Sequence, residues 1–234
     1  MKKYFRWLYK EKDYYPPLTR KGYLEQFGLK KQKGKYVVTD RQKLEHAYSK
    51  AWENRDYEID KFWTRAAYFW GFIVLIFGGY VTVLTGERAQ PAIEMHLDLY
   101  LLLLGFLFSI SWYLVIRGSK TWQTNWEMHI DFLEDFVSGP LYKTVFYSGK
   151  KFYSVSKLNE VMSIVVLIVW TMLLTQFTIT KFKLFANDKL TTAEFYGLLF
   201  SLVGTAVFAM VMFVGYASGG YRSDKNRFIG RWDR

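Results

Sequence analysis

The 234-residue chain contains no cysteine, only four prolines and only three histidines. Without cysteine it has no disulfide framework, no thiolate zinc site, no iron–sulfur cluster and no cysteine nucleophile. The few prolines and the 17 glycines exclude collagen-like and low-complexity chains. Intrinsic disorder is excluded as well, because 51% of the residues are apolar and 20% are aromatic.

Charge is missing from four long stretches of the chain, namely residues 66–84, 99–116, 161–180 and 195–218. They contain 19, 18, 20 and 24 residues, and about 20 apolar residues suffice for a helix to cross the hydrocarbon core of a bilayer. The sequence therefore predicts an all-α membrane protein with four transmembrane helices. The same spans lack the ionisable side chains that ion-coupled transporters and proton pumps normally carry at depth.

Lysine and arginine are distributed unequally between the segments outside these spans. Residues 1–65 hold 17, residues 117–160 hold six and the tail after Ser218 holds five, against one and three in the remaining two loops. Because cytoplasmic loops are enriched in basic residues, this split of 28 to four predicts that both termini and the central loop are cytoplasmic. The basic residues favour a bilayer with anionic headgroups. No nucleic-acid-binding motif accompanies the net charge of +11, so nucleic acid is not an expected partner.

Two segments precede the first span. Residues 1–38 form a basic, aromatic arm, interrupted by Pro16-Pro17 and three glycines, for which we expect irregular or short helical structure. A helix is then predicted over residues 39–84, with Thr39 as its N-cap and Gln42 completing a capping-box pattern. No glycine or proline separates its cytoplasmic part from the first span, so it would be a single rod about 65 Å long.

The central segment, residues 117–160, carries a tryptophan-rich amphipathic helix that Ser138-Gly139-Pro140 ends. One face of this helix is apolar, and the members expected to pack are Trp122, Trp126, Ile130 and Leu133. A second face is an acidic stripe, formed by Glu127, Asp131, Glu134 and Asp135. Two aromatic runs, 144–147 and 150–155, flank Ser148-Gly149 and predict a small β-hairpin, with longer helical turns as the alternative. A basic tail, residues 219–234, follows the last span.

The sequence contains no recognisable catalytic or cofactor-binding motif, including the metalloprotease, serine hydrolase, Walker A and dinucleotide patterns. His129, Asp131 and Glu134 form the one mixed cluster and are weak candidates for a metal site. In a helix His129 and Asp131 point about 200° apart, so they would need another chain to share an ion. We therefore expect a solvated or inter-subunit acidic face, with no catalytic residue, no bound metal and no cofactor.

Small residues recur at steps of four within two of the spans. On the fourth span they are Gly197, Ser201, Thr205 and Ala209, and on the second span they are Gly105 and Ser109. In lipid such ridges let helix backbones approach closely. The ridges predict either packing within the chain or contact between subunits.

Several strings resemble the RipA-like family of small bacterial inner-membrane proteins. They are Ala-Ala-Tyr-Phe-Trp-Gly-Phe in the first span, Arg-Gly-Ser-Lys-Thr-Trp-Gln-Thr-Asn-Trp-Glu-Met-His-Ile-Asp-Phe-Leu-Glu, Gly-Pro-Leu-Tyr-Lys and Tyr-Ser-Val-Ser-Lys-Leu-Asn. The resemblance covers roughly residues 45–175 and is best over 112–157. It implies an octamer in the bacterial inner membrane and implies no catalytic residues.

The combined interpretation is a homo-oligomeric membrane scaffold or regulator. The alternative is a pore in which the acidic stripe faces the axis. A third hypothesis is an enzyme acting on lipids, and only the headgroup-binding basic residues favour it. In the scaffold reading, the simplest arrangement pairs the acidic stripe with basic residues of a neighbouring subunit's N-terminal arm.

Overall fold

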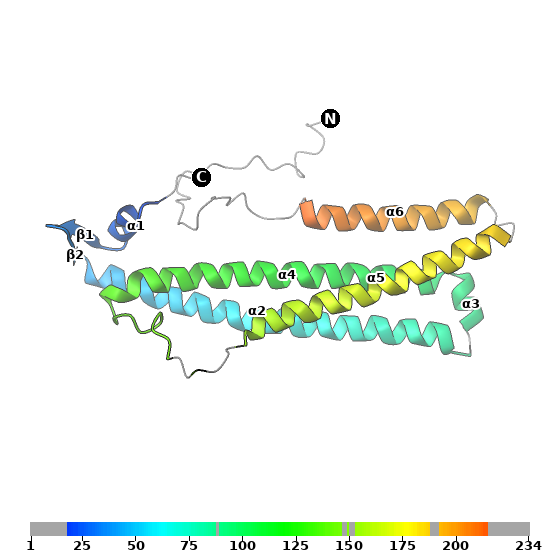
Figure 1. Cartoon of the computed structure of the whole chain (residues 1–234), viewed down its shortest axis with the longest axis horizontal. Coiled ribbons are helices and arrows are strands. Elements are labelled where there is room, and N and C mark those ends of the chain that lie inside the picture. The colour runs from blue at the N-terminus through cyan, green and yellow to red at the C-terminus, as the bar shows by residue number, and fades with distance from the viewer. Residues whose placement is uncertain (1–17, 88, 147–148, 150–152, 188–191, 215–234) are drawn as a thin grey trace, which may run out of the picture. The chain divides into compact units, whose positions relative to one another are not determined.

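The computed structural model describes residues 18–87, 89–146, 149, 153–187 and 192–214 (Figure 1). The chain divides into two compact units. The polar unit comprises Met1–Lys61, Ser119–Phe152 and Ser218–Arg234, and the membrane unit comprises Phe62–Gly118 and Tyr153–Ala217. Residues 1–17 of the arm, 147–148 and 150–152 of the expected hairpin, 215–218 of the fourth span and the tail 219–234 lie outside the described residues.

Four long helices account for most of the described chain, and Figure 1 labels them. They are α2 (Arg41–Thr85), α4 (Leu97–Leu133), α5 (Val155–Asn187) and α6 (Thr192–Val214), with the short α3 (Ala89–Glu94) before α4. Each of the four contains a segment that is long and apolar enough to cross a membrane. The prediction of an all-α membrane protein with four spans is confirmed. Helix α4 also runs without a break through Gly118-Ser119, where the span was expected to give way to a loop.

Helix α4 is the central helix of the membrane unit. In its most apolar segment 44% of the residues are buried, against 11% for each of the other three spanning helices. One row of buried positions on α4 recurs at alternating steps of three and four, namely Leu102, Gly105, Ser109, Trp112 and Ile116, and Leu99, Leu103 and Ile110 are buried beside it. This is the spacing of a coiled-coil seam, in which a narrow stripe of one helix faces its neighbour.

Two neighbours cover this seam. Phe62 and Ile73 of α2 join Trp112 and Ile116 in one buried cluster. Trp170 of α5 packs on Gly105 so closely that a Cβ built on this glycine would lie 2.5 Å from the indole ring. Small side chains on α4 therefore make room for a large aromatic side chain on α5.

The described part of the polar unit starts with a short helix, and a β-hairpin that the sequence analysis did not predict follows it. Helix α1 (Arg20–Gln26) is followed by β1 (Leu29–Gln32) and β2 (Lys35–Val38), which pair antiparallel with Leu29 opposite Val38. The short helix agrees with the expectation of irregular or short helical structure in this arm, and the two strands do not. The two-residue turn has positive φ at Lys33 (46°) and Gly34 (85°), as a type I′ hairpin turn requires.

The hairpin expected around Ser148-Gly149 is not found where the structure describes that stretch. Residues 144–146, 149 and 153–154 carry no strand, and Val155 already belongs to α5. The small sheet that was expected is thus present, but at residues 29–38. Both stretches contain a residue–glycine turn pair. At 29–38 the apolar residues Leu29, Tyr36 and Val38 join a core, whereas the described apolar residues near Ser148-Gly149, namely Val145, Phe146 and Tyr153, are 70–87% exposed.

A small apolar core holds the polar unit together. Its fully buried members are Tyr23, Leu24, Leu29, Leu44 and Leu133, which come from α1, β1, α2 and α4. Asp40 caps α2, because its Oδ1 accepts a hydrogen bond from the backbone N–H of Lys43 (2.9 Å). The predicted cap, Thr39, is wrong by one residue, since its hydroxyl donates to the carbonyl of Gly28 instead (3.0 Å).

Candidate functional site

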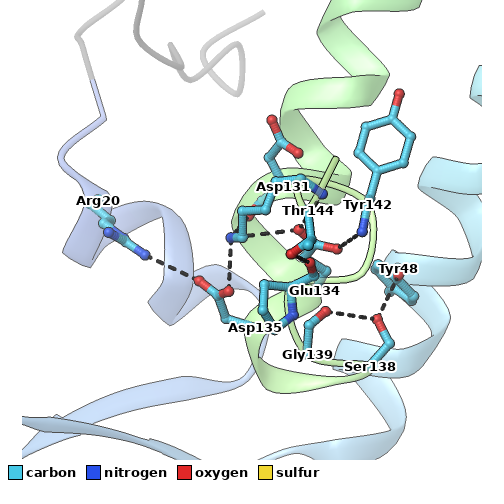
Figure 2. A network of polar contacts seen from close by, with 11 residues as sticks. Arg20, Tyr48, Asp131, Glu134, Asp135, Ser138, Gly139, Tyr142 and Thr144 are labelled. Carbon is cyan, nitrogen blue, oxygen red and sulfur yellow. Dashed lines mark hydrogen bonds and ion pairs between the residues drawn. The ribbon is translucent and has the colours of Figure 1, made fainter. Parts of the chain in front are cut away.

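Glu134 anchors the most distinctive polar arrangement in the polar unit. It begins the 3₁₀ turn Glu134–Phe136 that ends α4, and its side chain is fully buried. Its carboxylate accepts hydrogen bonds from the backbone N–H groups of Tyr142 (2.6 Å; Figure 2) and Lys143 (3.2 Å). Backbone donors thus compensate a buried charge, and in return the carboxylate fixes the segment that follows α4.

Lys143 and Arg20 supply the positive charge of this network. The Lys143 Nζ lies 2.8 Å from Asp135 and 3.6 Å from Glu134, and it donates to the carbonyl of Asp131 (2.9 Å). Partial burial lowers the pKa of Lys143, but its bond to Asp135 and the surrounding carboxylates outweigh this effect and raise it. Arg20 of α1 lies 3.6 Å from Asp135, so one cation of the N-terminal arm meets the acidic stripe within its own chain (Figure 2).

The other half of the acidic stripe forms no ion pair. Within the described part of the chain neither Glu127 nor Asp131 has an ion pair, and the buried Oδ1 of Asp131 has no hydrogen-bond partner. Burial, followed by repulsion from Glu134, raises the pKa of Asp131, against an opposing effect of Lys143. Glu127 accepts a hydrogen bond from the neutral Gln123 amide (2.8 Å). This face of α4 therefore carries more negative than positive charge.

His129 lies in an aromatic cluster. Its Nδ1 is 2.7 Å from the Tyr23 hydroxyl, and its ring centroid is 5.5 Å from that of Trp126. Burial lowers the pKa of His129 to about 4, so the imidazole is neutral at physiological pH. The contact joins α1 to α4 by a neutral hydrogen bond between partly buried groups.

The three weak metal candidates do different things in the fold. His129 faces Tyr23 and the aromatic rings, Glu134 binds backbone N–H groups, and in Figure 2 the Asp131 carboxylate points away from Glu134. Among the described residues no group of three or more histidine and carboxylate side chains is placed to hold an ion. Glu134 and Asp135 thus order the end of α4, whereas Glu127 and Asp131 form no ion pair within the described chain.

Of the predicted packing residues on this helix, Ile130 and Leu133 are buried and Trp126 is half-buried. Trp122 is 38% exposed within its own chain, so its burial against a neighbouring subunit stays a prediction. Trp122 lies outside the three-and-four seam, which continues along α4 through Trp126, Ile130 and Leu133.

The two small-residue ridges have different surroundings. Gly105 and Ser109 lie in the packed seam, which is the intrachain alternative. A Cβ built on Gly197 would meet nothing within 4 Å, and α6 packs on α4 through Leu198 instead. Ser201 and Thr205 on the same ridge are half-buried. The ridge of α6 is thus open at Gly197.

Arg55 has a role that sequence reasoning overlooked. Its guanidinium lies over the rings of Trp52 (5.4 Å) and Tyr142 (5.6 Å) and pairs with Asp56 (2.9 Å). It thereby ties the segment held by Glu134 to α2 through cation–π contacts. Only the fold reveals this role, because Tyr142 lies far from Arg55 in the sequence.

Comparison with protein families decides the membership of this chain. A model of the octameric membrane protein family (8xMP) matches residues 45–180, which include three of the four spans and the whole tryptophan-rich helix. The chain belongs to this family. The expectation of an octameric membrane family is confirmed. The name of the family implies that its members assemble into octamers. No curated protein and no solved structure gives a match.

Proposed function

We propose that this member of the octameric membrane protein family is a homo-octameric scaffold or regulator in the bacterial inner membrane. The observation that carries the proposal is the use of the hydroxyl groups inside the spans. Seven of them donate to the carbonyl four residues earlier on their own helix, namely those of Thr82, Ser109, Ser111, Thr171, Thr175, Thr178 and Ser201. Their hydrogen atoms are engaged within the helices.

A water-filled passage is lined by polar groups that replace the hydration shell of an ion, or by rings of charge. The four charge-free runs supply no charged side chain, and the seven hydroxyls use their hydrogen atoms within their own helices, which leaves only their oxygen lone pairs for water or an ion. The acidic stripe supports the same conclusion, because Glu134 and Asp135 are occupied by Lys143 and by backbone groups. We therefore favour a scaffold over the alternative of a pore with an acidic vestibule.

The proposal includes no catalytic reaction and no cofactor. The neutral, aromatic-enclosed His129 supports this, because general acid–base catalysis needs a group that exchanges protons near the working pH. The basic residues next to the spans are proposed to bind anionic headgroups rather than to act on lipids. Arg117, for example, already pairs with Glu160 (3.8 Å) and contacts the Tyr113 hydroxyl (3.1 Å).

The excess of basic residues assigns an orientation to the octamer. With 17, six and five lysines and arginines in segments of one side and only one and three on the other, the polar unit belongs on the cytoplasmic face. The scaffold would then present α1, the hairpin and the end of α4 to the cytoplasm. These elements are the proposed contact surface for regulation.

Reconstitution separates the scaffold from the pore. The mass of the purified assembly is measured by native mass spectrometry, and its conductance is then measured in planar bilayers. The same measurements are made on the variant Glu127→Gln/Asp131→Asn and on the matched exposed variant Asp56→Asn. We expect an octamer and no conductance above that of protein-free lipid for all three proteins. A cation-selective conductance that the double variant alters, and Asp56→Asn does not, would replace the scaffold by the pore.

A further inference from the structure

An octamer in a membrane must use two different faces of each subunit. All copies insert in the same orientation, so only rotation about the membrane normal can relate them, because other axes would invert some of the copies. Such cyclic assemblies are closed by heterologous contacts, in which one surface patch meets a different patch on the next subunit. The polar unit should therefore carry two complementary surfaces.

The β1–β2 hairpin carries the first surface. Lys30, Lys31, Lys33 and Lys35 fall within six residues, all are exposed, and none has an ion pair among the described residues. The register places Lys30 opposite Val37 and Lys35 opposite Gln32, on the sheet face away from Tyr36. Tyr36 itself contacts Phe136 with ring centroids 6.0 Å apart. The hairpin is thus fixed to the unit on the face of Tyr36, which also carries Lys31. It presents Lys30 and Lys35 on the other face, and Lys33 lies in the turn.

The second surface is the part of the acidic stripe that forms no ion pair. Glu127 and Asp131 are one helical turn apart on α4, and within the described chain neither carboxylate has an ion pair, although Lys143 acts on Asp131 from a longer distance. Other carboxylates of the polar unit are paired within the chain, for example Glu45 with Arg41 and Glu53 with Lys50. Unpaired positive charge and unpaired negative charge thus remain on two separate elements of the same unit.

We propose that the hairpin lysines of each subunit pair with Glu127 and Asp131 of the next subunit in the ring. The inference rests on the proposed octamer and names the contact between the polar units of neighbouring copies. Each pair is weak because it is partly exposed, but the contact recurs around the ring. Salt screens such pairs over roughly 8 Å at physiological strength, so the contact is salt-sensitive.

The absence of cysteine allows a direct test by cross-linking. Two chains distinguished by a tag are co-expressed, one carrying Lys35→Cys and the other Glu127→Cys, and treated in membranes with a short bis-maleimide. A long lysine–glutamate pair keeps its backbones too far apart for a disulfide, so a linker is required. We expect a cross-linked heterodimer, and a ladder of higher oligomers when both cysteines are placed in one chain.

The matched control replaces Glu127→Cys by Asp56→Cys, a carboxylate of α2 that is 65% exposed and already paired with Arg55. It should give no heterodimer. Cross-linking to Asp56→Cys alone, or no cross-linking at either position while native mass spectrometry still finds an octamer, would overturn the proposed contact and leave the octamer intact. Loss of the octamer itself in the wild-type protein would instead refute the proposed function.

Charge reversal provides the second test. Lys30→Glu/Lys35→Glu should cause loss of the octamer at a lower salt concentration than in the wild-type protein. Adding Glu127→Lys/Asp131→Lys to the same chain should restore the wild-type salt tolerance, since it restores opposite charges across the contact. If the lysines serve only to protect the strand edges, the first variant will keep the wild-type salt tolerance, and the proposal fails. Loss without restoration by the second pair contradicts it as well.

Discussion

At the scale of single residues, His129 lies in surroundings that oppose its protonation. Tyr23, Phe27 and Trp126 enclose the imidazole, and its Nδ1 contacts a hydroxyl that is itself buried. Burial also raises the pKa of Tyr23, so this pair stays neutral over the whole physiological range. A neutral pair joins α1 to α4 without the desolvation cost of a buried ion pair.

The lowered pKa of His129 predicts a loss of stability in acid. An unfolded histidine takes up its proton near pH 6.5, whereas folded His129 does so only near pH 4. The unfolded state binds more protons in this window, so the free energy of unfolding falls as the pH is lowered from 6.5 to 4, by about 3 kcal/mol. Urea unfolding of the polar unit, followed by tryptophan fluorescence, measures this loss. His129→Gln does not titrate and should lose less stability over the window, and parallel pH profiles of the two proteins would contradict the assignment.

A second prediction at this scale concerns Gly105. A Cβ there would lie 2.5–2.6 Å from three carbons of the Trp170 ring, within a buried seam. Gly105→Ala should therefore destabilise the membrane unit by about 1–3 kcal/mol through overpacking. Thermal melting in detergent measures this loss. The control is Gly118→Ala on the same helix, because a Cβ built on Gly118 would meet no other atom within 4 Å. Equal melting temperatures for the two variants would show that Trp170 does not pack on Gly105.

At the scale of elements, the spans followed from the sequence and the hairpin did not. A run of uncharged apolar residues has one physical solution in lipid, a helix, so the four spans were predictable from composition alone. In β1 and β2 the alternation is only four residues long and is obscured by the lysines beside Leu29 and Tyr36. The signals that could have revealed it are Lys33-Gly34 as a two-residue turn and the apolar positions at both ends.

The candidate site was predictable in its residues and not in their roles. The helical spacing groups Glu127, Asp131, Glu134 and Asp135 as one stripe, but such a pattern assigns the same exposure to all four residues. Glu134 is buried because α4 ends there in a 3₁₀ turn and because backbone N–H groups of the next segment meet its carboxylate. These contacts depend on the path that the chain takes after α4. The spacing of residues along a helix contains no information about that path.

The two tryptophans of α4 test the position of its seam. Trp126 lies on the seam and contacts His129, whereas Trp122, one turn earlier, is 38% exposed. Trp126→Ala should destabilise the polar unit by about 3 kcal/mol, at the lower end of the range for buried tryptophans. Trp122→Ala should leave the unfolding of the single chain nearly unchanged and weaken the octamer if a neighbour covers it. Urea unfolding and native mass spectrometry distinguish these effects, and a larger loss of chain stability for Trp122→Ala would show that the seam is misplaced.

At the scale of the whole molecule, the orientation in the membrane follows from the distribution of basic residues. The split of 28 to four is large because the arm and the central segment are both basic and the two remaining loops are short. Both termini are therefore expected on the cytoplasmic side. A fluorescent protein fused after Arg234 should be bright, and alkaline phosphatase at the same position should be inactive. Strong phosphatase activity there would contradict the orientation and would place the polar unit outside the cytoplasm.

The central claim is that eight copies form a closed scaffold. A density map of the octamer in a lipid nanodisc tests this claim most directly, because it shows the axis and the neighbouring polar units together. We expect the axis to be filled by lipid or by apolar side chains across the bilayer, with no continuous polar passage. A water-filled passage through the membrane, with Glu127 and Asp131 of all copies facing it, would contradict the account and identify the assembly as a pore.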